Sequence, residues 1–94
     1  MDDVKIIYFS AKWCGPCKAY KPLMESLEQA GYPIYFEDVD EDPILAESHH
    51  VRSVPTIKIL KNDSVVETMV GVQDPEILTA KFQLYYPLDT SSEG

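Results

Sequence analysis

The chain has 94 residues, of which 45% are apolar and 26% charged, and its formal net charge is −8 at pH 7. This length predicts a single domain, residues 1–94, near the lower limit at which packing alone supplies a hydrophobic core. Because phosphates and anionic lipids bind clusters of lysine and arginine, so acidic a chain is not expected to bind nucleic acid or a membrane. The first residues contain no basic segment followed by a long apolar one, so we expect no export signal and a cytoplasmic location.

The first apolar run, Val4–Phe9, predicts a central strand buried on both faces of a sheet. The segment Trp13–Cys17 follows it and precedes a helical pattern. The unpaired N–H groups and the partial positive charge of a helix N-terminus favour the thiolate over the thiol at Cys14. The thiolate is the nucleophile of disulfide exchange, and Cys17, one helical turn later, is close enough to resolve a mixed disulfide at Cys14. The pattern therefore predicts a redox-active cysteine pair.

The same two cysteines, the only ones in the chain, also fit a structural disulfide, a buried pair of thiols or half of a metal site. A disulfide between them would close too short a loop to stabilise the fold much, and a metal site would need more ligands. His49 and His50 are the only histidines, and their place near the end of a predicted helix favours an exposed, structural role. A site shared between two copies of the chain stays open as an alternative.

An amphipathic helix is predicted after the cysteines, because apolar residues recur at helical spacing. They are Tyr20, Leu23, Met24, Leu27 and Ala30. Gly31 is placed to end this helix in a left-handed conformation. Pro22 lies inside the pattern, and we expect it to kink the helix rather than stop it.

The middle of the chain continues the alternation, with a second strand predicted over Ile34–Val39. Asp42 followed by Pro43 is typical of a helix N-cap and first helical position, which predicts a short helix through about His50. Glu37 to Asp42 form an acidic run interrupted only by Val39, and we expect it to be a solvated strand end and helix start.

The last third of the chain predicts an antiparallel hairpin and a helix. Thr56–Leu60 and Val65–Val70 are two strands joined by a polar turn, and Asp74-Pro75 repeats the capping signal. The apolar side of the last helix is predicted to comprise Ile77, Leu78, Phe82 and Tyr85. Pro87 ends that helix, and 87–94 are expected to form a frayed tail.

The order β-α-β-α-β-β-α predicts an α/β fold, a four-stranded mixed sheet with helices on both faces. The cysteine motif then lies at the carboxyl end of the first strand, where open α/β sheets carry their sites.

These residues resemble the thioredoxin family over nearly the whole chain. Trp13–Lys18 matches the family's active-site signature, and Pro22 matches its helix-kinking proline. Residues 52–56 resemble the loop that carries the family's cis-proline, and 70–72 resemble its glycine-containing loop. The resemblance implies a minimal thioredoxin-like fold and a thiol–disulfide oxidoreductase that reduces protein disulfides.

The resemblance also implies roles for individual residues. Cys14 would attack a substrate disulfide, and Cys17 would resolve the mixed disulfide. A substrate strand would pair with the backbone of Val54, a form of β-augmentation. The residues implied to bind substrate are Trp13, Gly15, Pro16, Val54, Pro55, Gly71 and Val72.

The implied partners are disulfide-containing proteins and an external electron donor similar to a thioredoxin reductase. No metal and no bound cofactor are implied beyond the Cys14–Cys17 disulfide, and the chain is expected to act as a monomer.

The sequence departs from the family in two respects. Its first predicted strand is the one that feeds the active site, so we expect the minimal architecture shared with glutaredoxins, without the family's leading strand and helix. Tyr8 stands where the family has a buried aspartate, and Phe36 where it has a lysine. Burying an aromatic ring costs less than burying a charge. We therefore expect that Tyr8 only packs, and that water or the Cys14 leaving thiolate takes the proton of Cys17.

Two alternative functions remain open on the sequence. A glutaredoxin-like, glutathione-dependent reductase fits the short architecture, although the Gly-Pro between the cysteines and the preceding Trp13 oppose it. A non-catalytic module could instead hold a partner protein on Trp13, Val54 and Val72.

Overall fold

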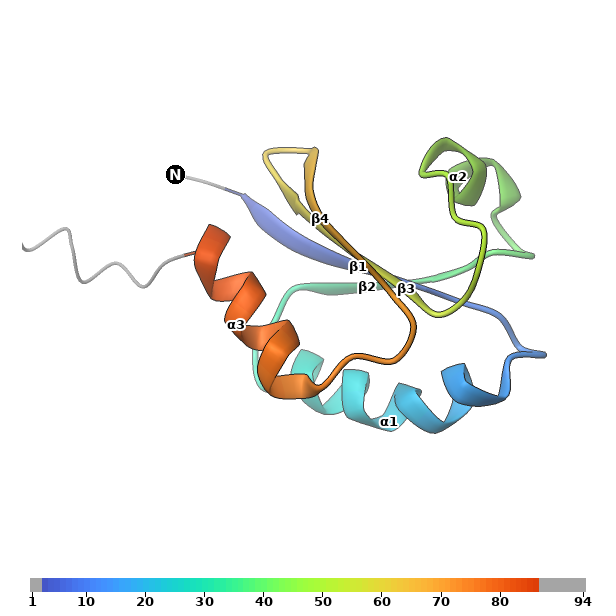
Figure 1. Ribbon diagram of the computed structural model, residues 1–94, viewed down its shortest axis with the longest axis horizontal. Helices are drawn as coiled ribbons and strands as arrows, with labels where there is room; N and C mark the ends of the chain where they lie inside the picture. The colour runs from blue at the N-terminus through green and yellow to red at the C-terminus, as the bar shows by residue number, and fades with distance from the viewer. Residues whose placement is uncertain (1–2, 87–94) are drawn as a thin grey trace, which may run out of the picture.

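The computed structural model describes residues 3–86 of the chain (Figure 1). Its elements are β1 (Val4–Ser10), α1 (Gly15–Gln29), β2 (Ile34–Asp38), α2 (Pro43–Ser48), β3 (Thr56–Lys61), β4 (Ser64–Val70) and α3 (Pro75–Tyr85). The sheet order is β2-β1-β3-β4. β1 pairs with β2 in parallel, and the β1–β3 and β3–β4 pairs are antiparallel. The predicted α/β fold with a mixed four-stranded sheet is confirmed, whereas the tail expected over 87–94 lies outside the described residues.

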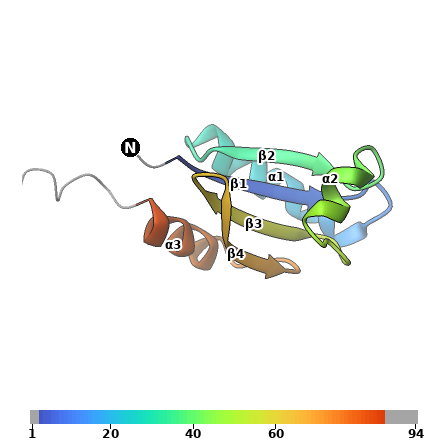
Figure 2. The same ribbon diagram turned by 90° about the horizontal axis from the view of Figure 1, so that it is seen from above.

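The two faces of the sheet are covered unequally. α1 and α3 lie against one face and α2 against the other, as Figures 1 and 2 show from two directions. The larger buried cluster lies on the side of α1 and α3, and its members are Val4, Ile6, Tyr8, Tyr20, Met24, Ile34, Ile57, Ile59, Met69, Leu78 and Phe82. The smaller cluster consists of Ile7, Phe9, Ala46 and Leu60. Most of the apolar core therefore lies between the sheet and two helices.

β1 is the central element of this arrangement. Its side chains alternate between the two clusters, with Ile6 and Tyr8 in the larger one and Ile7 and Phe9 in the smaller one. All four are buried. The nearly continuous apolar sequence of this strand is thus explained by burial on both faces.

Each helix begins at a side chain that accepts a backbone N–H. Cys14 caps α1 by accepting from the amide of Cys17, Asp42 caps α2, and Asp74 caps α3. α1 continues past Pro22 to Gln29, so the proline does not stop it. Gly31 follows with a φ of +110°, the left-handed conformation expected of it.

Two residues expected in the apolar sides of helices are exposed. Ile77 is 52% exposed, because Leu78 and Phe82, four residues apart, define the buried side of α3 and Ile77 is turned about 100° away from Leu78. Ala30 is exposed because it is the C-cap that follows the last helical residue.

His49 differs from expectation in the opposite direction. It was expected to be exposed but is only partly exposed, because its ring lies 5.4 Å from that of Phe9. Among residues 3–86 no helix is long and apolar enough to cross a membrane.

Candidate active site

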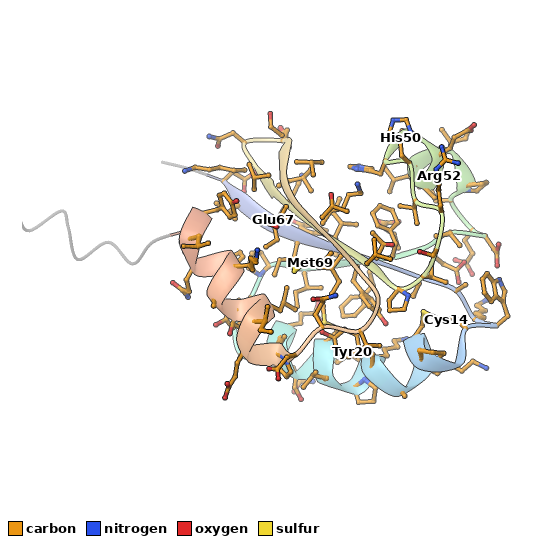
Figure 3. All side chains as sticks on the ribbon, viewed as in Figure 1. Cys14, Tyr20, His50, Arg52, Glu67 and Met69 are labelled. Carbon is orange, nitrogen blue, oxygen red and sulfur yellow. A yellow bond between two sulfur atoms is a disulfide. The ribbon has the colours of Figure 1, made fainter. Side chains whose placement is uncertain are left out.

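Cys14 and Cys17 form a disulfide at the N-terminus of α1. Cys14 comes from the bend after β1, and Cys17 is the third residue of the helix. The backbone N–H of Cys17 donates to Sγ of Cys14 over 3.2 Å. The two cysteines are 5% and 2% exposed, and Figure 3 shows Cys14 at the start of α1. The disulfide is thus held at the helix N-terminus, where one otherwise unpaired N–H, that of Cys17, points at Sγ of Cys14.

The loop before β3 lies against this disulfide. Sγ of Cys14 is 3.6 Å from the carbonyl oxygen of Val54, and Val54 packs against the cluster of Ala11, Cys14 and Cys17. The peptide bond between Val54 and Pro55 is cis, and Pro55 is buried. The backbone before this proline is therefore next to the sulfur atom that was expected to be the nucleophile.

The loop after β4 joins the loop before β3 through the backbone. The N–H of Gly71 donates to the carbonyl oxygen of Pro55 over 2.8 Å. Gly71 has a φ of +92°, a conformation that favours glycine over residues with a side chain. The side-chain amide of Gln73 donates to the carbonyl oxygens of Val70 and Gly71. Val72, between Gly71 and Gln73, is 55% exposed.

Trp13 stands beside the disulfide with 69% of its surface exposed. Its indole Nε1–H donates to Oδ2 of Asp40 over 2.7 Å. Oδ1 of Asp38 in turn accepts from the amides of Asp40 and Glu41. The acidic run is therefore not merely solvated: it contains the hydrogen-bond partner of the exposed tryptophan. The sequence carries no signal for this contact beyond an acidic loop at the same end of the sheet.

The residues expected to bind substrate thus lie at one end of the sheet, at the start of α1 and in the loops before β3 and after β4. Cys14, Val54, Pro55 and Gly71 are joined by the contacts above. Gly15 and Pro16 are exposed on the first turn of α1.

Below the disulfide, the expected packing of aromatic rings is present. The ring of Tyr8 lies 5.9 Å from that of Tyr20 and 5.7 Å from that of Phe36. The Tyr8 hydroxyl, however, also donates a hydrogen bond of 3.1 Å to the carbonyl oxygen of Cys17. Burial, with a smaller contribution from Tyr20, raises the pKa of Tyr8 to about 12. Tyr8 therefore does more than pack, and it remains a neutral phenol near neutral pH.

A pocket of about 560 Å³ opens beside Cys17, between the first turns of α1 and the ends of β1 and β2. Its polar lining includes Ser10, Lys18, Lys21 and Asp38. Within residues 3–86 there is no group of three or more histidine, cysteine, aspartate or glutamate residues that could hold a metal ion. The Cys14–Cys17 disulfide at a helix N-terminus, with the Cys17 amide directed at Sγ of Cys14, supports thiol–disulfide exchange.

Comparison with known proteins agrees with this geometry. A family model described as Thioredoxin matches residues 1–83. A thioredoxin of Bacillus subtilis is 41% identical over 80 residues, which cover 82% of this chain and 77% of that protein. A thioredoxin of Chlamydia trachomatis is 40% identical over 75 residues, 78% of this chain and 74% of that protein.

A solved structure gives the same result. A mutant thioredoxin from Halobacterium salinarum superimposes with a TM-score of 0.84 at 39% sequence identity, covering 92% of this chain and 77% of that one. The chain therefore belongs to the thioredoxin family, and it is a thiol–disulfide oxidoreductase.

Proposed function

We propose that this oxidoreductase reduces disulfides of other proteins through a dithiol–disulfide cycle of Cys14 and Cys17. The observation that carries the proposal is the Cys14–Cys17 disulfide at the N-terminus of α1, with the Cys17 amide donating to Sγ of Cys14. In the reduced protein, the same amide and the helix N-terminus stabilise a thiolate at Cys14. Cys14 is therefore the nucleophile, and Cys17 is the resolving cysteine.

The cycle has two exchange steps. The Cys14 thiolate attacks one sulfur of a substrate disulfide, forms a mixed disulfide with it and releases the other sulfur as a thiolate. Cys17 then loses its proton and attacks Sγ of Cys14, which releases the second substrate thiolate and leaves the Cys14–Cys17 disulfide. Two electrons pass to the substrate, whose two thiolates take up protons.

The Cys17 proton leaves through solvent or with the departing thiolate. The pocket beside Cys17 supports a solvent route, because it opens next to this residue and has a polar lining. Tyr8 is not the acceptor, since its hydroxyl keeps its own proton near neutral pH.

The substrate groove runs beside the disulfide, between the start of α1 and the loops before β3 and after β4. Trp13, Gly15 and Pro16 form one lip, and their exposure supports a role in contact with a partner. On the other side a substrate strand pairs with the backbone of Val54, next to Pro55. The 3.6 Å separation of the Val54 carbonyl oxygen from Cys14 supports this placement.

Gly71 and Val72 complete the groove. The hydrogen bond from Gly71 to Pro55 supports this assignment, because it keeps the loop after β4 beside the cis-proline. Val72 presents an exposed apolar side chain from the same loop.

The rest of the proposal concerns the protein's surroundings. Electrons come from an external donor similar to a thioredoxin reductase, and the protein binds no cofactor of its own. A dithiol that must be regenerated works in a reducing compartment, which favours the cytoplasm. Residues 3–86 form one thioredoxin-like domain that acts as a monomer, because one copy supplies all the proposed residues of the groove.

The test is catalytic reduction of a small disulfide-bonded protein by a dithiol donor, with the wild type compared with Cys14→Ser and Cys17→Ser. We expect the wild type to accelerate reduction and both variants to lose catalysis. Cys17→Ser should accumulate a mixed disulfide at Cys14, whereas Cys14→Ser should form none. Background rates from a folded wild-type protein would contradict the proposal.

The same assay separates the alternative functions. A glutaredoxin-like enzyme would turn over with glutathione as the only donor. A binding module would hold its partner equally well after either cysteine is replaced.

A further inference from the structure

The hydroxyl of Tyr8 is the one polar group of this side chain, and it lies below the candidate active site. Tyr8 is 0% exposed, and its ring contacts those of Tyr20 and Phe36. The hydroxyl donates to the carbonyl oxygen of Cys17. Packing alone would be satisfied by phenylalanine, so the hydroxyl needs a separate explanation.

Cys17 is held at both ends of its backbone. Its N–H donates to Sγ of Cys14 over 3.2 Å, and its carbonyl oxygen accepts from Tyr8 over 3.1 Å. The second bond links the first turn of α1 to β1, the strand that carries the chain into the cysteine motif. Tyr8 thereby helps to fix where Cys17 lies relative to Cys14.

The geometry of the hydroxyl favours positioning over proton transfer. Burial raises the pKa of Tyr8 to about 12, and its proton is directed at a backbone oxygen rather than at a sulfur atom. A neutral phenol fixed in this way can influence the reaction through the position of the group it holds.

We propose that Tyr8 is a positioning residue for the resolving step, and that its hydroxyl aligns Cys17 for attack on the mixed disulfide at Cys14. The inference rests on the roles proposed above for the two cysteines. In the step concerned, Cys17 loses its proton and bonds to Sγ of Cys14. The bond between that sulfur and the substrate sulfur breaks, and the substrate leaves as a thiolate.

The test uses two matched variants, Tyr8→Phe and Tyr20→Phe. Tyr20 is also buried, and its hydroxyl donates to a backbone carbonyl, that of Gln73, over 2.7 Å. Each substitution removes one buried hydroxyl and keeps the ring. A purely structural effect should therefore appear in both variants, whereas a positioning effect on Cys17 should appear only in Tyr8→Phe.

Each reduced protein is mixed in a stopped-flow instrument with one equivalent of dithiobis-nitrobenzoate, whose released thiolate is coloured. The first release reports attack by Cys14, and the second reports resolution by Cys17. We expect Tyr8→Phe to slow the second release about fivefold, the effect of losing one ordinary hydrogen bond, and to leave the first unchanged. Tyr20→Phe should keep both rates within about twofold.

The pH dependence of the second release provides a further readout. Positioning predicts that Tyr8→Phe lowers this rate at every pH and leaves the pH of its half-maximum unchanged. Urea unfolding of both variants checks that they are folded to a similar extent.

Three results would overturn the inference. They are resolution at the wild-type rate in Tyr8→Phe, equal slowing in Tyr20→Phe, or a half-maximum displaced in Tyr8→Phe alone, which would indicate proton transfer. Failure of the proposed function gives a different result, because the wild type would then show no rapid first release.

Discussion

Several polar residues near the sheet have an environment that their residue type alone does not predict, because each contacts a specific partner. Asp40 would be an ordinary solvated carboxylate, but it accepts the indole N–H of Trp13. His49 would be an exposed histidine, but its ring lies against Phe9. Lys58 is only 8% exposed and donates to Oγ1 of Thr68 over 3.3 Å. At this scale the contact partner, more than the residue type, sets the property that an experiment measures.

His49 makes stability depend on pH. Burial, followed by the charges of Lys58 and His50, lowers the pKa of His49 from its ordinary value of 6.5. The native state therefore favours the neutral imidazole, and the unfolded chain binds the proton first as the pH falls. This contribution to stability is present above about pH 6.5 and is lost as the pH falls through the lowered native pKa.

The measurement is urea unfolding at about pH 8 and about pH 5. We expect His49→Gln to lose less free energy of unfolding between these two pH values than the wild type loses, because the carboxylates titrate in both proteins. His50→Asn removes only the smallest of the three causes and should therefore change the pH dependence less than His49→Gln does. Asparagine tolerates the φ of +57° at this position. An identical pH dependence of the wild type and His49→Gln would contradict the prediction.

At the scale of single elements, the start of each helix is set by a capping side chain that accepts a backbone N–H. Asp42 accepts from the amide of Leu45 over 3.1 Å at the start of α2, and Asp74 accepts from that of Glu76 over 2.8 Å at the start of α3. Each carboxylate satisfies an N–H that the helix leaves unpaired, and its charge is favourable at the positive end of the helix dipole. At the start of α1, Sγ of Cys14 accepts the amide N–H of Cys17 in the same way.

Replacing Asp74 tests the contribution of a cap to the fold. Asp74→Ala should lower the free energy of unfolding by about 1 kcal/mol, because the amide of Glu76 loses its acceptor. Asp74→Asn keeps an acceptor oxygen and should therefore lower the free energy of unfolding by less. Chemical denaturation of the three proteins measures both differences, and equal stability of the wild type and the alanine variant would show that the cap is unimportant.

The molecule as a whole depends on the core between the sheet and the α1–α3 layer. α3 contributes Leu78 and Phe82 to this core, and both are buried. A domain of this size retains only about 5–15 kcal/mol of net stability. The free energy lost when a single large side chain is removed from this layer is therefore a sizeable fraction of the total free energy of unfolding.

Two leucines of α3 give a matched test of this statement. Leu78 is 0% exposed and Leu84 is 70% exposed. Leu78→Ala should lower the free energy of unfolding by about 2–5 kcal/mol, because it leaves a cavity in the core. The Tm should fall by roughly 4–8 °C for each kcal/mol lost. The free energy of unfolding of Leu84→Ala should stay within about 0.5 kcal/mol of the wild-type value. Thermal unfolding of both variants decides the matter, and similar losses would mean that α3 is not packed as described.

The sequence by itself determined the kind and order of the elements and the place of the cysteine pair at a helix start. These properties are local: strand and helix periodicity, the Asp-Pro starts and Gly31 all act within a few residues. Even locally, the pattern did not distinguish Ile77 from its buried neighbour Leu78, since the buried side of a helix depends on what packs against it.

Only the tertiary structure decided the contacts around the disulfide. Trp13 meets Asp40 across 27 positions of sequence, and Tyr8 meets Cys17 across 9. Gly71 reaches Pro55 because β3 and β4 pair in a register that aligns Val70 with Thr56. Such contacts depend on how strands pair and how α1 lies on the sheet, and these are settled by burying side chains from distant parts of the chain together.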